Sequence, residues 1–421
     1  MVNFRRMNTS ASIDLAMVRD AFPAFQEPAL ADQVFLENAG GSYACAPVIE
    51  RLEQYYRKTK VQPYYPSAPS RDAGDAMDAS YTRLAPWLGV TPDWLHFGPS
   101  TTQNAYVLAQ AAHGFLTSGD NIVVTEQEHE ANSGAWRRLA QTGIDVREWR
   151  VLPDSGRLDP DDLDQLLDDR TRIVAFTHCS NIVGHINPVA VIAKKVRDAG
   201  AISIVDGVSS AAHGFPDVAA LGADVYLFSL YKTYGPHQGL MVIRPDVAQT
   251  FVNQSHFFNA DQPRKRLVPA GPDHAQVAAA QGIADYFEAV VAHHDPTDST
   301  PARARLARCF GAAEDALLKR LLDGLAELKG VRVIGPTSES DRAPTVSLLA
   351  DAIPSDELCR ALAEHGVMAG SGHFYAKRLL QAMGIDDTPG VLRLSFVHYT
   401  SGDDIDAALD ALDRCLAARR H

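Results

Sequence analysis

Between about residues 94 and 245, short apolar runs alternate with stretches in which apolar positions recur every three to four residues. The apolar runs are rich in Val and Ile and end in small or hydroxyl-bearing residues, as buried strands do. Such alternation is typical of βαβ units, so we expect an α/β fold built on a mainly parallel sheet. The clearest predicted strands are 172–178, 201–205, 223–229 and 239–243, with a helix over 188–198.

The pattern changes after residue 271. Helical periodicity extends over 275–293 and 302–328, and is followed by predicted strands and helices in an α+β order: strands 331–334, 345–349 and 391–396, a helix over 355–364 and a last helix to about 418. Thr400 and Asp403 have the spacing of a capping box for that last helix. We therefore expect an N-terminal arm (1–33), a large domain (34–290) and a small C-terminal α+β domain (291–421), and leave open a contribution of the N-terminal segment to the small domain.

Lys232 follows the end of the predicted strand 223–229 and precedes a Gly-Pro break. Ligands collect at the carboxyl ends of strands in open α/β sheets. A lysine that is desolvated there can lose its proton and become a nucleophilic amine, as formation of a Schiff base requires. From this segment alone, a surface lysine in a turn is an equal alternative.

Two earlier strands bring further polar residues to the same edge, since strand 201–205 leads into Asp206 and strand 172–178 leads toward Asn181. A buried carboxylate is costly unless it meets a positive partner. A protonated pyridine nitrogen is such a partner, and this pairing is typical of pyridoxal phosphate sites. Asp206 alone could be a turn residue, but a shared site explains all three positions.

Several motifs carry a resemblance to a known family: 35–41 (FLENAGG), 100–104 (STTQN), 128–132 (EHEAN) followed by Trp136, then Asp206, Lys232 and 393–395 (RLS). In their order and spacing, from about residue 34 to 412, the chain resembles the class V aminotransferases, in the cysteine-desulfurase-like branch of the fold-type I enzymes that use pyridoxal 5′-phosphate. The resemblance implies a large domain with a seven-stranded, mainly parallel sheet, and a homodimer with the active site at its interface.

The same resemblance implies roles for individual residues. Lys232 would hold the cofactor and act as general base, Asp206 would pair with its ring nitrogen, and His129 would stack on the ring as a third catalytic group. The start of a helix after Ser100 is a ready phosphate site, although ordinary N-capping explains it equally well. The remaining cofactor residues implied are Thr101, Thr102, Asn181, Ser209, Ser229, Tyr231 and Gly271.

On the substrate side, Arg393 lies in an apolar strand and needs a partner. Its guanidinium fork suits a substrate α-carboxylate, with a structural salt bridge as the alternative. The resemblance adds Asn38, His373 and Tyr375 to the substrate side. It also places Gly271 in a loop that reaches a neighbour's phosphate, where Pro272 replaces the family's threonine and removes a donor.

One departure from the desulfurase branch is chemically informative. The loop that there reads Arg-x-Gly-His-His-Cys-Ala reads Gly-Ser-Gly-His-Phe-Tyr-Ala here, over residues 370–376. Tyr375 replaces the nucleophilic cysteine and Gly370 the arginine. Because a persulfide requires a thiolate, we expect no desulfuration from this loop. Tyr375 either donates a hydrogen bond to substrate or helps to wall off water.

Three classes of reaction on a small amino acid or amine remain. Transamination is the reaction that we favour, since it needs only Lys232 as base and a keto acid or aldehyde as acceptor. A β- or γ-elimination uses the same carbanion with a leaving group, and an epimerisation or a biosynthetic carbon–carbon step is the third class. A catalytically silent binding protein is the non-enzyme alternative, against which Lys232 and Asp206 argue.

The composition of the chain limits the kinds of partner and the cellular location that we expect. A formal net charge of −13 argues against general nucleic-acid binding. The sequence lacks a run of about 18 apolar residues, so no membrane span is predicted. The segment Met1–Arg6 lacks the apolar core of a secretory signal. The five cysteines are dispersed and no zinc spacing occurs, which favours reduced thiols, a cytoplasmic location and no metal. The His293-His294-Asp295 cluster is interpreted as a solvated loop.

Overall fold

Seven strands form the central sheet of the larger domain in the computed structural model, which describes residues 13–294 and 296–419. Their spatial order is β2-β8-β7-β6-β5-β3-β4. All neighbours pair in parallel except β8, which is antiparallel to both β7 and β2. The mainly parallel α/β prediction is thus confirmed. The strands are β2 (Leu95–Gly98), β3 (Asn121–Thr125), β4 (Asp145–Trp149), β5 (Thr171–Thr177), β6 (Ile202–Asp206), β7 (Val225–Ser229) and β8 (Gly239–Ile243).

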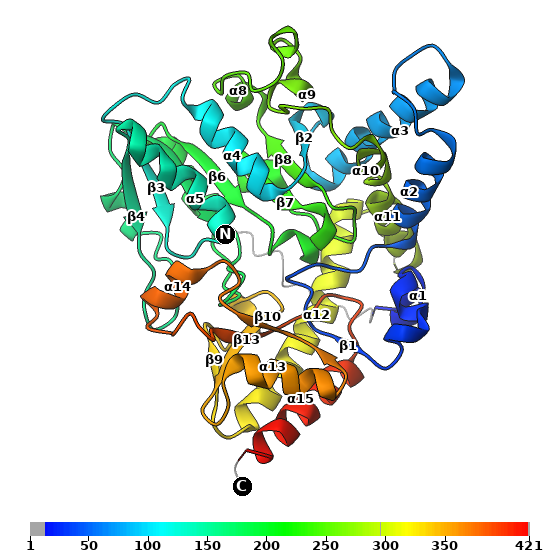
Figure 1. The fold of residues 1–421 in the computed structure, drawn as a ribbon, viewed down its shortest axis with the longest axis vertical. Helices are drawn as coiled ribbons and strands as arrows, with labels where there is room; N and C mark the ends of the chain where they lie inside the picture. The colour runs from blue at the N-terminus through cyan, green and yellow to red at the C-terminus, as the bar shows by residue number, and fades with distance from the viewer. Residues whose placement is uncertain (1–12, 295, 420–421) are drawn as a thin grey trace.

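Both faces of this sheet are covered, as its largely apolar central strands require. Alternate residues along a strand enter different cores: Ile204 and Leu227 pack with helices α4 and α5, whereas Val205 and Phe228 pack on the opposite face. Figure 1 shows the sheet in the upper part of the molecule with α4 and α5 beside it. The helices of this domain are α2 (Ala46–Lys58), α3 (Ala68–Leu84), α4 (Thr101–Ala112), α5 (Gly134–Arg137), α6 (Val189–Asp198), α7 (Val218–Leu221), α8 (Pro245–Ala248), α9 (Pro263–Arg266), α10 (His274–Ala279) and α11 (Gly282–His294).

The helix expected over 275–293 is divided into α10 and α11. The break falls where the Gln281 N–H donates to the Ser80 hydroxyl of α3, 3.1 Å away. A Cβ on Gly282 would meet the Val48 backbone nitrogen at 2.6 Å, so this position must stay bare for α2 to approach. Tertiary contacts with α2 and α3 therefore interrupt a sequence whose local pattern is continuous.

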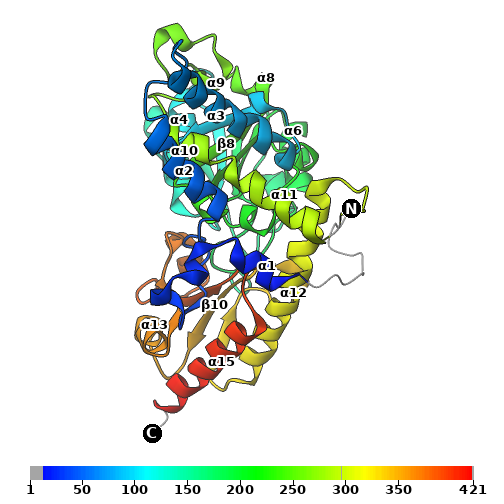
Figure 2. The ribbon, with the colours of Figure 1, turned by 90° about the vertical axis from the view of Figure 1, so that its right-hand side faces the viewer.

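A second, antiparallel sheet of four strands, in the order β12-β13-β10-β9, forms the smaller domain below the first (Figure 2). Its strands and helices are β9 (Val331–Ile334), β10 (Thr345–Ala350), β12 (Gly370–Gly372), β13 (Val391–Ser395), α13 (Ser355–Glu364), α14 (Lys377–Ala382) and α15 (Gly402–Ala417). The capping box at α15 is present one position later than predicted, between Ser401 and Asp404.

The N-terminal segment reaches into this smaller domain. Strand β1 (Val34–Phe35), which the predicted boundary at residue 34 assigns to the large domain, pairs in parallel with β11 (Val367–Met368). Leu36 follows it into the apolar core formed by the smaller domain's sheet and helices. Helix α1 (Leu15–Asp20) of the arm lies at the junction of the two domains (Figure 2).

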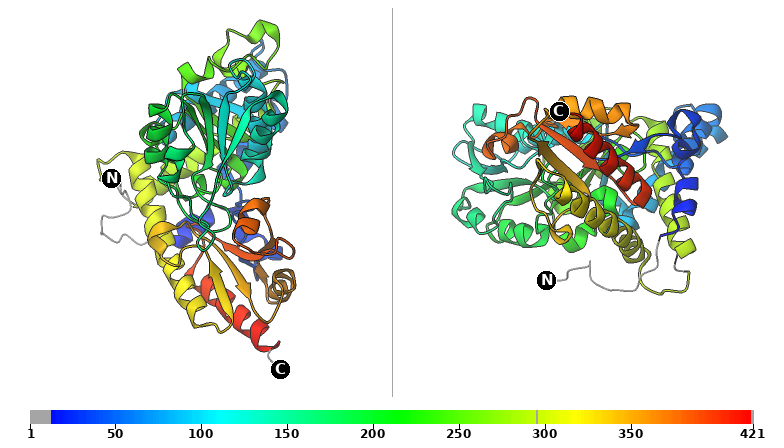
Figure 3. Two further views of the ribbon diagram at one scale, coloured as in Figure 1. Left: turned by 90° about the vertical axis from the view of Figure 1, so that its left-hand side faces the viewer. Right: turned by 90° about the horizontal axis from the view of Figure 1, so that it is seen from below.

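The long helix α12 (Ala302–Glu327) belongs to both domains. Its first half buries Leu306 and Phe310 in the core of the large domain, and its second half buries Leu318 and Leu325 in the core of the small one. Figure 3 shows this helix running along one side of the molecule from the upper domain to the lower.

Within residues 13–294 and 296–419, the structure contains no helix long and apolar enough to cross a membrane. In the same ranges, no group of three or more His, Cys, Asp and Glu side chains is placed to hold a metal ion. His293 contacts the Asp14 carboxylate at 3.0 Å, and His294 accepts the Asp14 N–H at 2.7 Å. The predictions made for Met1–Arg6 and Asp295 lie outside the described residues.

Candidate active site

The carboxyl ends of β5, β6 and β7 open onto one pocket. Asp206 is the last residue of β6, Asn181 follows β5, and Lys232 closes a single 3₁₀ turn after β7. Parallel strands bring their ends to the same sheet edge, which is why residues far apart in sequence meet here. The pocket is lined by all the predicted cofactor residues except Gly271: Thr101, Thr102, His129, Asn181, Asp206, Ser209, Ser229, Tyr231 and Lys232.

One end of the pocket has the form of an anion site. Ser100 caps α4, accepting the Gln103 N–H at 3.2 Å, and the first residues of the helix, Thr101 and Thr102, line the pocket. The hydroxyl oxygens of Thr101 and Ser229 lie 2.7 Å apart. A Cβ on Gly239 would overlap the Ser100 backbone, so glycine at the start of β8 permits this close approach.

His237 is a pocket residue that the sequence analysis missed. Its ring stacks on Tyr231, with ring centroids 4.6 Å apart and planes 4° from parallel. The histidine comes from the tight connection between β7 and β8. A Gly-Pro-His turn leading back from a site lysine was the available signal, because so short a connection returns its residues to the same edge.

Asp206 is buried without a cationic hydrogen-bond partner in the described part of the chain. Its Oδ1 accepts the Val208 N–H at 2.9 Å. Burial raises the pKa of this carboxyl to about 6, although Lys232 opposes the shift. A protonated pyridine nitrogen would supply the missing positive charge, so the environment of Asp206 fits pyridoxal phosphate.

Lys232 and His129 are both held toward their neutral forms. Burial of the Lys232 amine, reinforced by the positive charge of Arg393, lowers its pKa to about 8. Burial of His129, together with the charge of Lys232, lowers the pKa of its ring to about 3. The His129 Nδ1 accepts the Ala131 N–H at 3.0 Å, which fixes the ring. The site thus offers a nucleophilic amine beside a neutral imidazole.

Arg393 already has a carboxylate partner. Its Nη2 lies 2.8 Å from Oε1 of Glu37, and its Nη1 donates to the Asn181 carbonyl oxygen at 3.2 Å. The Phe374 ring covers the guanidinium, with Cζ 3.7 Å from the ring centroid. The salt bridge kept as the alternative in the sequence analysis is therefore present, and Glu37 is a site residue that the analysis missed.

The loop over 370–376 is hydrogen-bonded to residues beside the pocket. Asn181 donates its Nδ2 to the Phe374 carbonyl oxygen at 2.9 Å, and Glu130 donates its N–H to the Tyr375 carbonyl oxygen at 2.8 Å. Phe374 and Tyr375 adopt φ of 46° and 59°, a left-handed conformation that is unusual for bulky residues. Strain of this kind persists where surrounding contacts impose it, often near functional sites.

The other predicted substrate residues are more scattered. Asn38 shares a small hollow with Lys232 and Ser209 at the domain junction, and the Tyr399 hydroxyl donates to its Oδ1. Tyr375 is largely exposed, with its ring centroid 5.2 Å from that of His129. His373 lines an outer hollow with Tyr375. Gly271 is exposed and does not line the pocket of Lys232.

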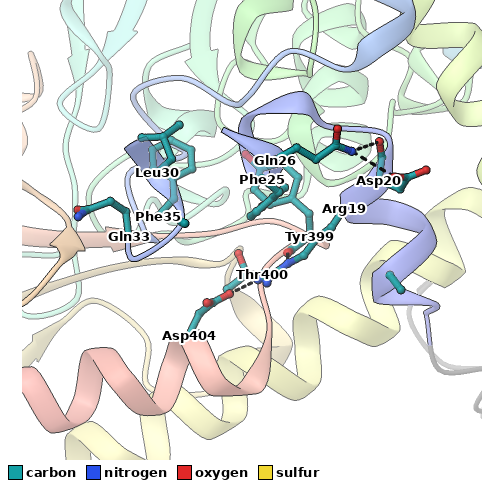
Figure 4. A pocket seen from close by; sticks show the side chains of 12 residues that line it. Arg19, Asp20, Phe25, Gln26, Leu30, Gln33, Phe35, Tyr399, Thr400 and Asp404 are labelled. Carbon is teal, nitrogen blue, oxygen red and sulfur yellow. Dashed lines mark hydrogen bonds and ion pairs between the residues drawn. The ribbon is translucent and has the colours of Figure 1, made fainter. Parts of the chain in front are cut away.

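A separate pocket lies between the N-terminal arm and the small domain, and Figure 4 shows its lining. Arg19 is held there by the Asp404 carboxylate and by the Tyr399 carbonyl oxygen, and its guanidinium lies over the Phe25 ring. None of the predicted catalytic, cofactor or substrate residues lines it. The contacts of Arg19 in this pocket attach the N-terminal arm to the start of α15.

Comparison with known proteins agrees with this geometry. The family model described as "Aminotransferase class-V" matches residues 34–255 and 308–408. The chain belongs to the class V aminotransferase family. Members of this family are enzymes that use pyridoxal 5′-phosphate, which the pocket fits through Asp206, Lys232 and the start of α4.

Two relatives are similar over almost their whole lengths. "Aminotransferase-like protein FGM3" of Gibberella zeae is 33% identical over 97% of this chain and 100% of that protein. A protein of Pseudomonas aeruginosa named "Probable cysteine desulfurase" is 30% identical over 96% of this chain and 98% of its own.

A solved structure, the apo form of a cysteine desulfurase from Thermococcus onnurineus, superposes with a TM-score of 0.84 at 24% identity, covering 98% of this chain and 100% of that one. This likeness shows the shared fold.

Proposed function

We propose that this class V aminotransferase family member transfers the amino group of a small amino acid. The observation that carries the proposal is one pocket at adjoining strand ends that holds both a desolvated lysine, Lys232, and a buried carboxylate, Asp206. The neighbouring loop bears Tyr375 in place of a cysteine. The bound cofactor supplies an electron sink for the pair left when the Cα proton departs.

Individual residues of the chain have separate roles in this reaction. With the cofactor bound, the Asp206 carboxylate would keep the ring nitrogen protonated, and the Lys232 amine would take the Cα proton as general base. The Thr101 and Ser229 hydroxyls, which lie together, and the first N–H groups of α4 would hold the phosphate. His129 would pack against the ring. Overall, the amino acid leaves as its keto acid, with water supplying the carbonyl oxygen, and a second keto acid accepts the amino group.

Desulfuration, which the names of several relatives describe, is not part of the proposal. A persulfide requires a thiolate within reach of the substrate. Cys179 is the one cysteine that lines the pocket among the described residues; it is 1% exposed, and its Sγ–H donates to the Gly184 carbonyl oxygen at 3.3 Å. Its packed position supports a structural thiol.

A spectral titration tests the proposal. Amino acids are added singly to the purified holoenzyme, and the cofactor absorbance and the released products are followed. Transamination predicts conversion to the amine form of the cofactor with one equivalent of keto acid. Keto acid formed together with a leaving group, without that conversion, would instead assign an elimination, and exchange of the Cα proton with inversion would assign an epimerase.

We also propose a cytoplasmic homodimer. The five cysteines are odd in number and dispersed along the sequence, which supports a reducing compartment. Phe257 is 88% exposed and Phe258 66% exposed, and Tyr64 and Tyr65 are also exposed. These aromatic side chains come from the segment before α9 and the α2–α3 loop, at the upper end of the large domain in Figure 1. Exposed aromatic side chains of this kind support a protein–protein interface.

A further inference from the structure

The guanidinium of Arg393 is enclosed by groups from three parts of the chain. The Glu37 carboxylate comes from the segment after β1, the Phe374 ring from the 370–376 loop and the Asn181 carbonyl from the segment that follows β5. Arg393 Nε is buried and has no hydrogen-bond partner among the described residues. A buried cation needs a counter-charge, and Glu37 provides it.

The sequence makes room for this arrangement. Gly370 pairs with Arg393 between β12 and β13, and a Cβ on Gly370 would lie 2.9 Å from the Phe374 ring and 3.1 Å from Glu37 Oε1. A Cβ on Gly40 would overlap the Glu37 carboxylate. Glycines on both sides of Glu37 therefore leave the space that its carboxylate occupies. An arginine at position 370, as in the desulfurase loop, would need this same space.

The two partners differ in their freedom to move. The Arg393 side chain is 3% exposed and fixed, whereas the Glu37 side chain is 31% exposed. Glu37 can therefore turn toward water while the guanidinium stays in place. An incoming carboxylate on Arg393 would stand beside Glu37, and two like charges at one fork repel each other.

We propose that Glu37 is an internal competitor for the carboxylate site on Arg393, so that a substrate's α-carboxylate binds by displacing it. The inference rests on the proposed function, since it concerns how that site admits an amino acid. Glu37 then sets specificity: amino acids bear the cost of displacing it, whereas amines without a carboxylate leave the Glu37–Arg393 pair intact.

The test compares wild-type holoenzyme with Glu37→Gln, which keeps the size of the side chain and removes its charge. The probes are amino acids and the matched amines that lack only the α-carboxylate, beginning with alanine and ethylamine, and their affinities are read from the cofactor absorbance. We expect Glu37→Gln to bind alanine about tenfold more tightly, the equivalent of one charge-assisted hydrogen bond, and to bind ethylamine unchanged. Glu327→Gln, at an exposed position near the end of α12, is the control.

A second readout does not need the cofactor. Acetate is added to the cofactor-free protein and the thermal midpoint is followed. Glu37→Gln should gain more stability from acetate than wild type does.

Unchanged or weaker alanine binding in Glu37→Gln, with wild type still responding to amino acids, would overturn the inference alone. Absence of any spectral response of wild type to amino acids, with acetate still stabilising Glu37→Gln preferentially, would overturn the proposed function and leave the competitor in place.

Discussion

Thr101 and Ser229 bring their hydroxyl oxygens within 2.7 Å of each other across 128 positions of sequence. Thr101 opens α4 and Ser229 ends β7, so the contact joins a helix start to a strand end. Both hydroxyls face the anion end of the pocket, where the first N–H groups of α4 are also available. The pair is therefore positioned to bind one phosphate from two directions.

Replacing Thr101 by Val removes one of these hydroxyls without changing the shape of the side chain. We expect the dissociation constant of pyridoxal phosphate to rise by about tenfold or more, because a charge-assisted hydrogen bond is lost. Equilibrium dialysis of the cofactor against the protein measures the change. Thr82→Val, at an exposed position of α3, should leave the constant unaltered. Equal affinity in Thr101→Val would remove this hydroxyl from the phosphate site.

The reactivity of Lys232 should depend on pH. The neutral amine is the nucleophile, and burial lowers its pKa to about 8. The rate at which the cofactor-free protein forms a borohydride-stable adduct with pyridoxal phosphate should therefore rise with pH and level off above about pH 8. Lys232→Ala should form no adduct in the pocket, as peptide mapping will show. A rate that climbs steadily toward the ordinary lysine value of about 10.4 would contradict the desolvated amine.

Asp206→Asn preserves the size of the side chain and removes its charge. The cofactor should still bind through its phosphate, but turnover should fall by about 10²-fold or more, because the ring nitrogen loses the partner that keeps it protonated. Measuring cofactor content and turnover on the same sample separates the two effects. Near-normal turnover in a loaded Asp206→Asn enzyme would reassign the carboxylate to a structural role.

Tyr375 is expected to exclude water and not to transfer a proton, since its side chain is largely exposed beside His129. Tyr375→Phe should keep most of the activity, whereas loss of a proton-transferring phenol would cost about 10²-fold. Wild-type protein incubated with cysteine should carry no persulfide on residues 370–376. A persulfide formed at a catalytic rate on any of the five cysteines would restore desulfuration as the reaction.

The exposed aromatic pair Phe257 and Phe258 provides a test of assembly. Changing both to Ser should shift the sedimentation of the protein from dimer to monomer, since large apolar side chains at an interface contribute much of its binding energy. Their exposure means that folding of the single chain should be unaffected, which circular dichroism checks. A wild-type protein that sediments as a fully active monomer would refute the dimer.

Local patterning predicts most of the secondary structure of this chain. Strand β8 and helix α13 have the predicted bounds, because apolar runs and periodicity are properties of neighbouring residues. The strand ends also predict that Asn181, Asp206 and Lys232 share an edge, since parallel strands leave little freedom there. The antiparallel direction of β8 was implicit in its short connection to β7.

The sequence alone did not reveal the contacts between residues that are far apart along the chain. Glu37 meets Arg393 across 356 positions, and no local pattern distinguishes this glutamate from a solvated one. Gly370 looks like a loss of function relative to the desulfurase loop, and only the positions of Phe374 and Glu37 explain it. Likewise, the break before Gly282 depends on the closeness of α2.

The pairing of β1 with β11 has a consequence for biosynthesis. A chain is made from its N-terminus, so Val34 and Leu36 leave the ribosome long before Val367, their neighbour in the finished core, exists. Val34 and Leu36 therefore lack their final neighbour while the central sheet forms from the segments made after them. A fragment encoded by the 3′ part of the gene would consequently lack one strand and one core residue of the small domain, and in the full chain this domain can be completed only when translation is nearly finished.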